Sequence, residues 1–198
     1  MKQRLELQTG DNNKFLRFWH EIDFTKIGFG YANSVAALQS KKKWFPYNKG
    51  GTFRKWYGNI EYVVNWENDG QMIKEFRDGK GQIKSYPRNP DYYFKSSVSW
   101  SDVTLGSSSF RFFPDGFIFD STGHSAFPNE NMTAQQLLAI CNNKVYESII
   151  KVINPTFHFH VGYFNKLPAI PLDEDKIADC VNENISISRS EWNSFETS

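Results

Sequence analysis

Large apolar residues occupy every second position in several short stretches, a pattern typical of strands with one buried face. The clearest stretch covers residues 60–66. The Asn68-Asp69-Gly70 cluster after it predicts a hairpin turn into residues 71–76. Further strands are predicted at residues 92–105, 109–113 and 117–120, with the turn-forming triplet Pro114-Asp115-Gly116 before the last of them.

Helical periodicity appears only in the last third of the chain. Thr133 and Gln136 have the spacing of a capping box and predict a helix start. The apolar positions that follow extend to residue 153, and Asn142-Asn143 predicts a break into two helices before Asn154-Pro155 ends the run. Residues 156–164 alternate again, and another helix is predicted from Asp173.

Near the N-terminus, residues 1–17 predict a strand, a tight turn and a second apolar element. Residues 78–90 are rich in Gly, Lys and Pro and predict an exposed excursion. Together the patterns predict an α+β fold: a twisted, mostly antiparallel β-sheet domain with a helical segment near the C-terminal third.

Composition limits the class of protein. A chain of 198 residues forms one domain, or one domain with a small appendage. No apolar run is long enough to cross a bilayer and no secretory signal pattern is present, so we expect a cytoplasmic protein without a membrane partner. Cys141 and Cys180 are too few for a disulfide framework and are expected to be buried free thiols.

Positive charge is concentrated in one segment. Residues 41–57 contain six basic side chains, six aromatic rings and no acid, whereas the whole chain has a net charge of +1. The rest of the chain therefore carries +1 − 6 = −5. Cations release counterions from phosphates and rings stack on bases, so the segment is typical of a nucleic-acid contact. The alternative is a solvated turn beside ordinary core rings.

The candidate contacts follow from residue type. The Gly50-Gly51 pair favours a loop that another surface approaches closely. Basic side chains would hold phosphates, while amides and rings approach bases or sugars. His124 and Ser125 are expected at a sheet tip, with a turn histidine as the alternative reading of His124. The candidates are Lys41, Lys42, Lys43, Tyr47, Asn48, Lys49, Arg54, Lys55 and Trp56, followed by Arg88, Lys95, Arg111, His124 and Ser125.

Motifs for other chemistry are incomplete. His158 and His160 share one face of a predicted strand, but no third ligand stands at a recognisable spacing, so no metal site is expected. No signature of a serine or cysteine nucleophile is present. Asn89-Pro90-Asp91-Tyr92 resembles the adenine-holding motif of amino-methyltransferases, and residues 27–30 resemble a glycine-rich cofactor loop. The Asp at the third position and the missing βαβ pattern argue against a catalytic centre here.

Several blocks together resemble one family. They are residues 7–12 with Phe15 and Arg17, the Trp-rich block 44–59, and residues 66–70, 100–102, 116–120, 137–155, 183–185 and 192–198. These blocks are similar to the C-terminal half of the PglX-type adenine-specific DNA methyltransferases of BREX phage-defence systems. The similarity covers nearly the whole chain, and the Trp-rich block is its most specific part.

The resemblance implies a role. The family's catalytic and cofactor motifs lie upstream, so residues 1–172 are expected to form a target recognition domain, like those of TaqI-like methyltransferases and Type I specificity subunits, with an acidic helical tail at 173–198. The parent protein would transfer a methyl group from S-adenosylmethionine to N6 of adenine, and this chain, which holds no cofactor itself, would choose the site.

Expected partners are double-stranded DNA, the upstream methyltransferase domain, and other BREX proteins or a DNA-mimicking inhibitor. Two alternatives remain open: a glycan-binding module and a protein-interaction module that use the same rings.

Overall fold

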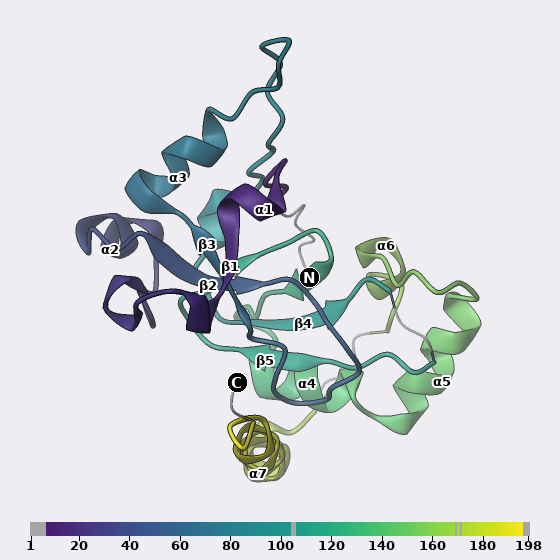
Figure 1. Cartoon of the computed structure of the whole chain (residues 1–198). Coiled ribbons are helices and arrows are strands. Elements are labelled where there is room, and N and C mark those ends of the chain that lie inside the picture. The colour runs from purple at the N-terminus through teal and green to yellow at the C-terminus, as the bar shows by residue number, and fades with distance from the viewer. Residues whose placement is uncertain (1–6, 104–105, 169, 171, 196–198) are drawn as a thin grey trace.

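The computed structural model describes residues 7–103, 106–168, 170 and 172–195. Helices and two open sheets make up the chain, which confirms the α+β prediction (Figure 1). Of the strand pairings between these elements, all but one are antiparallel. No helix among the described residues is long and apolar enough to cross a membrane.

The first sheet has four strands in the order β1-β3-β2-β6. Strand β3 lies within the alternating pattern predicted for residues 60–66. Val63, on the face opposite to Val64, is also buried. The short β6 joins as a parallel neighbour of β2. The four strands are β1 (Leu16–Phe18), β2 (Trp44–Asn48), β3 (Tyr62–Asn65) and β6 (Ile118–Phe119).

The second sheet has three strands in the order β5-β4-β7. All five residues of β4 are buried, because both faces of this central strand are covered. The strand predicted after the turn at residues 114–116 is present as β6, which pairs with β2 in the first sheet. The strands are β4 (Ser97–Ser101), β5 (Arg111–Phe113) and β7 (Gly123–Ala126).

Seven α-helices accompany the sheets within the described residues. The capping box predicted at Thr133 is present, with Gln136 N–H donating to Thr133 Oγ1 at 3.2 Å. Asn143 caps the next helix, so the predicted break is confirmed. The helices are α1 (Asn12–Phe15), α2 (Ser34–Gln39), α3 (Glu67–Lys74), α4 (Ala134–Cys141), α5 (Lys144–Ile153), α6 (Val161–Phe164) and α7 (Glu174–Trp192).

Two sequence predictions of secondary structure are wrong. Asn68, Asp69 and Gly70 have positive φ as a turn requires, but the chain continues as helix α3 and forms no hairpin. Residues 156–164 were expected to alternate as a strand, but they form one isolated β-bridge, between Val103 and His158, followed by helix α6. The predicted exposed excursion is confirmed for residues 79–84, which are all exposed and project from the molecule in Figure 1, whereas Ser85 is buried.

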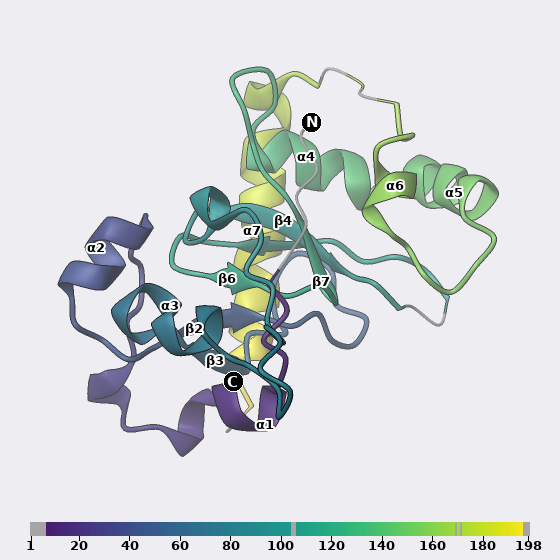
Figure 2. The same cartoon turned by 90° about the horizontal axis from the view of Figure 1, so that it is seen from above.

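Two large apolar clusters and a small third one, of Ile27, Trp44 and Val63, form the core of the described residues. One lies under the first sheet and includes Phe45, Val64 and Trp66. The other joins the second sheet to α4 and α7 and includes Trp100, Phe110 and Leu138. Helix α7 contributes buried Val181, Ile185 and Trp192 to that second cluster, and Figure 2 shows it running lengthwise past the sheets. The division of the chain at residues 172 and 173 stays a prediction.

The cysteines differ from each other. Cys141 in α4 is buried, and burial raises the pKa of its thiol. Cys180 in α7 is exposed, so the expectation that both thiols are buried is wrong for this residue. The reason is the orientation of α7, which turns its Val181 and Ile185 side chains toward the core.

Candidate nucleic-acid interface

The basic segment 41–57 does not form one continuous cationic loop. Its first part ends in β2, a strand whose five residues are all buried. Lys42 Nζ donates to the carbonyl of Thr25, and Lys43 Nζ lies 3.8 Å from Glu67 Oε2. The expectation of a single phosphate-gripping loop is therefore wrong, because packing of the strand separates its cations.

The second part of the segment is neutralised by helices from the end of the chain. Arg54 forms an ion pair with Glu191 of α7, and its guanidinium lies 4.7 Å from the ring centroid of Trp192. Lys55 Nζ lies 3.9 Å from Glu147 Oε2 in α5. Both cations serve internal contacts in this conformation, which makes them unsuitable as primary phosphate contacts.

Tyr47 and Asn48 were expected to approach bases, but both are buried. The Tyr47 hydroxyl donates to Asp120 Oδ2 at 2.8 Å, and burial together with that carboxylate raises the pKa of the phenol well above its usual value. Asn48 Nδ2 donates to Ser99 Oγ at 2.6 Å and to the Gly123 carbonyl at 3.1 Å. Their polar atoms join strands, so neither side chain reaches a ligand here.

Arg111 is the clearest correction among the cations, since none of its surface is exposed. Its Nη2 donates to Ser101 Oγ at 3.0 Å, and Nη1 lies 3.4 Å from the Arg54 carbonyl. Burial lowers the pKa of Arg111 to about 10, so the side chain stays charged at neutral pH. Arg111 therefore stabilises the loop after β2 by donating to its backbone carbonyls, and its guanidinium is not accessible to a phosphate.

His124 and Ser125 lie in β7 and not at an exposed tip. His124 is 6% exposed and Ser125 is 1% exposed. Both pair with β4, where Ser125 stands opposite Ser99. Both residues are buried because β7 pairs with the central strand β4. The local composition around residues 121–127 does not indicate this pairing.

The remaining candidates are scattered over the surface. Trp56 is half-buried, and its backbone N–H donates to the Phe110 carbonyl at 2.8 Å at the edge of the second sheet. Lys41, Arg88 and Lys95 are exposed on separate loops. The glycine pair was expected in a loop presented for contact, but Gly50 is buried and packs against the chain itself: a Cβ on it would lie 2.5 Å from the Thr122 carbonyl oxygen.

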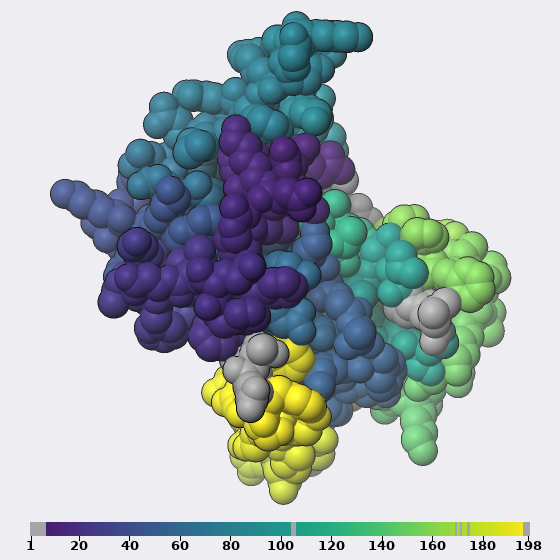
Figure 3. All heavy atoms as spheres, viewed as in Figure 1, coloured from purple at the N-terminus to yellow at the C-terminus, as the bar shows by residue number. Residues whose placement is uncertain are grey.

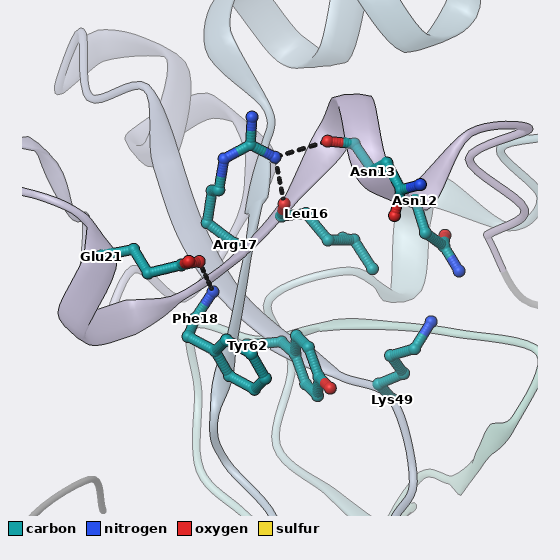
Figure 4. A pocket seen from close by; sticks show the side chains of 8 residues that line it. All are labelled: Asn12, Asn13, Leu16, Arg17, Phe18, Glu21, Lys49 and Tyr62. Carbon is teal, nitrogen blue, oxygen red and sulfur yellow. Dashed lines mark hydrogen bonds between the residues drawn. The ribbon is translucent and has the colours of Figure 1, made fainter.

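Lys49 lines a sizeable polar hollow, and Lys95 lines a separate one. A pocket of about 520 Å³ opens where α1, β1 and the ends of β2 and β3 meet, and we name it the α1–β1 pocket (Figure 4). Local pairing builds it, because Phe18 of β1 stands directly opposite Tyr62 of β3. Its lining residues are Asn12, Asn13, Leu16, Arg17, Phe18, Glu21, Lys49 and Tyr62.

Stacked rings form one wall of the α1–β1 pocket. Phe18 and Tyr62 stack with their centroids 4.8 Å apart, and His20 stacks on Phe18 at 5.5 Å. Lys49 Nζ lies 5.9 Å from the Tyr62 ring. A row of rings that ends in a cation offers stacking and charge attraction to the same ligand.

Two cations, Arg17 and Lys49, line the pocket, and two more lie over a ring that is not part of its lining. Arg17 donates from Nη1 to the carbonyls of Asn13 and Leu16, both at 2.6 Å, which fixes its position beside the rings. Lys14 and Lys84 approach the same Phe76 ring, at 4.5 and 5.8 Å. Among the described residues, none of these cations nor Lys49 forms an ion pair with a carboxylate.

One acid limits the positive potential. Glu21 lines the same pocket, but its carboxylate accepts the backbone N–H of Phe18 at 2.8 Å. Figure 3 shows the purple N-terminal segment and the blue connection between β2 and β3 exposed on one face, with yellow α7 beside them. The segments that supply Arg17 and Lys49 to the pocket are thus exposed on the same face.

Sequence reasoning missed most of this site. Lys14 and Arg17 follow an Asp11 cap, whose Oδ1 accepts from Lys14 N at 3.1 Å, but α1 has only four residues. A helix this short leaves no periodic signal in a sequence. Only the tertiary structure brings Arg17 and Lys49 into one pocket.

The fold is α+β, and the α1–β1 pocket brings cations and stacked rings together. Comparison with known proteins makes the relation more specific. The chain is 40% identical over 199 aligned residues to the adenine-specific methyltransferase PglX of Lacticaseibacillus casei (strain Zhang), an alignment that covers 100% of the chain and 16% of that protein.

A second relative gives the same result. The chain is 37% identical over 192 residues to the adenine-specific methyltransferase BrxX of Escherichia coli O9:H4 (strain HS), with 96% of the chain and 14% of that protein aligned. No protein-family model matches the chain. The chain therefore corresponds to about one sixth of each of these methyltransferases, and the function of the segment has to be argued from its own residues.

Proposed function

We propose that this chain is the DNA-recognition domain of an adenine-specific DNA methyltransferase of the BREX type. The single observation that carries the proposal is the alignment of the entire chain with a segment of adenine-specific methyltransferases. Such enzymes act on a base within a duplex, so part of the protein has to hold the double strand and read its sequence. The α1–β1 pocket supports this role because it combines cations, amides and rings.

Within this proposal the residues divide by chemistry. Lys14, Arg17, Lys49 and Lys84 contact phosphates, since no carboxylate of the described residues pairs with them. The exposed side-chain amides of Asn12 and Asn13 approach base edges, where an amide recognises adenine by paired hydrogen bonds. Lys41, Arg88 and Lys95 remain secondary candidates at the periphery.

The parent protein would supply the chemistry. S-adenosylmethionine would bind in the upstream methyltransferase domain and provide the methyl group for N6 of adenine. That domain would also receive the extruded base, while this chain holds the neighbouring duplex in register. Other BREX proteins, or a DNA-mimicking inhibitor that competes for the same cations, would be further partners.

Salt dependence of DNA affinity tests the proposal. The chain and its full-length parent are titrated with duplexes containing the methylation site, at several salt concentrations, by fluorescence anisotropy. Four neutralised phosphates predict a slope of log affinity against log salt of about −3.6, and replacing either Arg17 or Lys49 by Ala should flatten it by about 0.9.

Lys166→Ala is the matched control, because Lys166 is also an exposed cation near a ring, 5.5 Å from the Tyr163 centroid, but follows α6. This variant should keep the wild-type slope. Equal slopes for wild type, Arg17→Ala and Lys49→Ala would remove the α1–β1 pocket from the interface. Absence of any salt-dependent DNA binding by the parent would refute the proposed function.

A protein-interaction module is the second candidate, favoured by one observation. An apolar pocket of about 390 Å³ lies beside the exposed rings of Phe24 and Phe29, which contact each other at 5.0 Å. Loss of a partner without loss of DNA affinity in Phe24→Ala and Phe29→Ala variants would support this role. Competition by oligosaccharides that persists in high salt would instead support a glycan-binding module.

A further inference from the structure

Three of the four histidines of the chain converge on a single carboxylate. Asp102 directly follows β4, His124 lies in β7, and His158 and His160 precede α6. The fourth histidine, His20, stacks on Phe18 in the α1–β1 pocket. The DNA-binding proposal uses none of these three histidines.

The distances within this cluster match those of a metal site. Asp102 Oδ1 lies 2.9 Å from His160 Nδ1 and 3.2 Å from His124 Nε2. The ligand atoms of these three residues all lie within 4.8 Å of one another. Zinc bonds of about 2.0 Å in a tetrahedron place neighbouring ligand atoms roughly 3.3 Å apart, so small side-chain rotations suffice to surround an ion.

The backbone around the cluster is fixed before any ligand binds. Phe159 is buried at 1% exposure, whereas its neighbours His158 and His160 are exposed and both reach Asp102. Phe159 N–H donates to the Asp102 carbonyl at 2.7 Å, and Trp100 Nε1 donates to the Phe159 carbonyl at 2.8 Å. These contacts hold the two histidines against the end of β4 and reduce the ordering cost of binding.

His158 occupies a supporting position. Its Nδ1 lies 2.8 Å from Asp102 Oδ2, the oxygen that the other two histidines leave available. Such a contact orients a carboxylate so that its second oxygen faces a metal. The His158 and His160 rings stack with centroids 5.4 Å apart, which restricts both.

We propose that Asp102 Oδ1, His124 Nε2 and His160 Nδ1 bind a Zn²⁺ ion, with His158 orienting the carboxylate. Imidazole and carboxylate donors suit zinc, and three protein ligands leave one position for water. The ion joins β4, β7 and the segment before α6, so its principal role is to stabilise that region. Binding requires a lone pair on each ligating nitrogen, so the imidazole proton must reside on the other ring nitrogen.

Metal titration tests the site. The chain is purified without a polyhistidine tag, treated with a chelator, and titrated with Zn²⁺ by isothermal calorimetry and with Co²⁺ by visible absorption. We expect one ion per chain, visible bands typical of a low-symmetry Co²⁺ site, and a higher thermal midpoint with Zn²⁺, because the ion binds the folded state. Absence of stoichiometric binding would overturn the proposal and leave a hydrogen-bonded cluster only.

Three variants assign the ligands. His160→Ala should abolish binding, and His158→Ala should weaken it about tenfold, the usual range for a supporting contact. Both side chains are more than half exposed, at 58% and 55%, so their loss should leave the fold intact in circular dichroism. His20→Ala is the control and should bind as wild type does. Wild-type affinity in His160→Ala, or equal losses in all three variants, would refute this ligand set.

Discussion

At the scale of single residues, Arg111 shows how burial changes the role of a charged group. No carboxylate of the described residues pairs with it, and its Nε has no hydrogen-bond partner among them. Its other nitrogens meet the Thr52 and Arg54 carbonyls and the Ser101 hydroxyl. A buried cation is costly unless its donors are used, so Arg111 is tied to the loop conformation above it.

Replacing Arg111 by Met should lower the free energy of unfolding by about 1–3 kcal/mol, because loop carbonyls and a serine lose a charged donor while the apolar stem volume is kept. Chemical denaturation monitored by circular dichroism measures this loss. Arg88→Met changes an exposed arginine and serves as the control, with an expected change within about 0.5 kcal/mol. A stabilised Arg111→Met variant would show that desolvation of the charge exceeds its hydrogen bonding.

At the scale of elements, helix α7 and the loop after β2 support each other. Trp192 is 5% exposed, and a Cβ on Gly58 would lie 2.9 Å from its ring. Arg54 stacks on Trp192, and the Arg189 guanidinium lies 4.8 Å from the Tyr57 ring centroid. The C-terminal helix is therefore part of what fixes the basic segment.

Trp192→Ala should destabilise the protein by about 3–5 kcal/mol, since it removes a large ring from a packed cluster. It should also speed amide hydrogen exchange in residues 50–58, as measured by mass spectrometry. Ile187→Ala removes a side chain of the same helix that is 62% exposed and serves as the control. Unchanged exchange in the loop of Trp192→Ala would mean that α7 does not hold it.

At the scale of the whole molecule, the two sheets are connected through buried polar contacts. Asn48, at the end of β2, donates to Ser99 of β4 and to the Gly123 carbonyl of β7. Its own carbonyl accepts from Asp120 N–H at 2.8 Å. The two apolar clusters are joined here by directional hydrogen bonds, which fix the relative position of the sheets.

Asn48→Ala should therefore do more than lower stability. Loss of the side-chain bonds leaves buried acceptors unpaired, with an expected cost of about 1–3 kcal/mol. Hydrogen exchange should then show β3 and β4 opening with different free energies, whereas wild type opens both together. Asn165→Ala, at an exposed position after α6, is the matched control. Coincident protection of β3 and β4 in Asn48→Ala would place the connection elsewhere.

Local signals in the sequence determined the helical third of the chain and several strands. The Thr133 cap, the break at Asn142-Asn143 and the stop at Pro155 depend on neighbours a few residues away, so a linear pattern contains their whole cause. The alternation at residues 60–66 indicated β3 for the same reason. The six cations of residues 41–57 correctly indicated a local concentration of positive charge. They did not indicate which of these side chains are paired within the protein.

Tertiary structure alone decided which polar groups remain free. Arg54 meets Glu191 across 137 residues of sequence, Tyr47 finds Asp120 across 73, and Asp102 meets His158 across 56. Pairings over such separations depend on how sheets and helices assemble, and no short-range pattern records them. For that reason the sequence by itself determined many of the helices and strands and the resemblance to a family. The α1–β1 pocket and the histidine cluster exist only because tertiary packing brings their residues together.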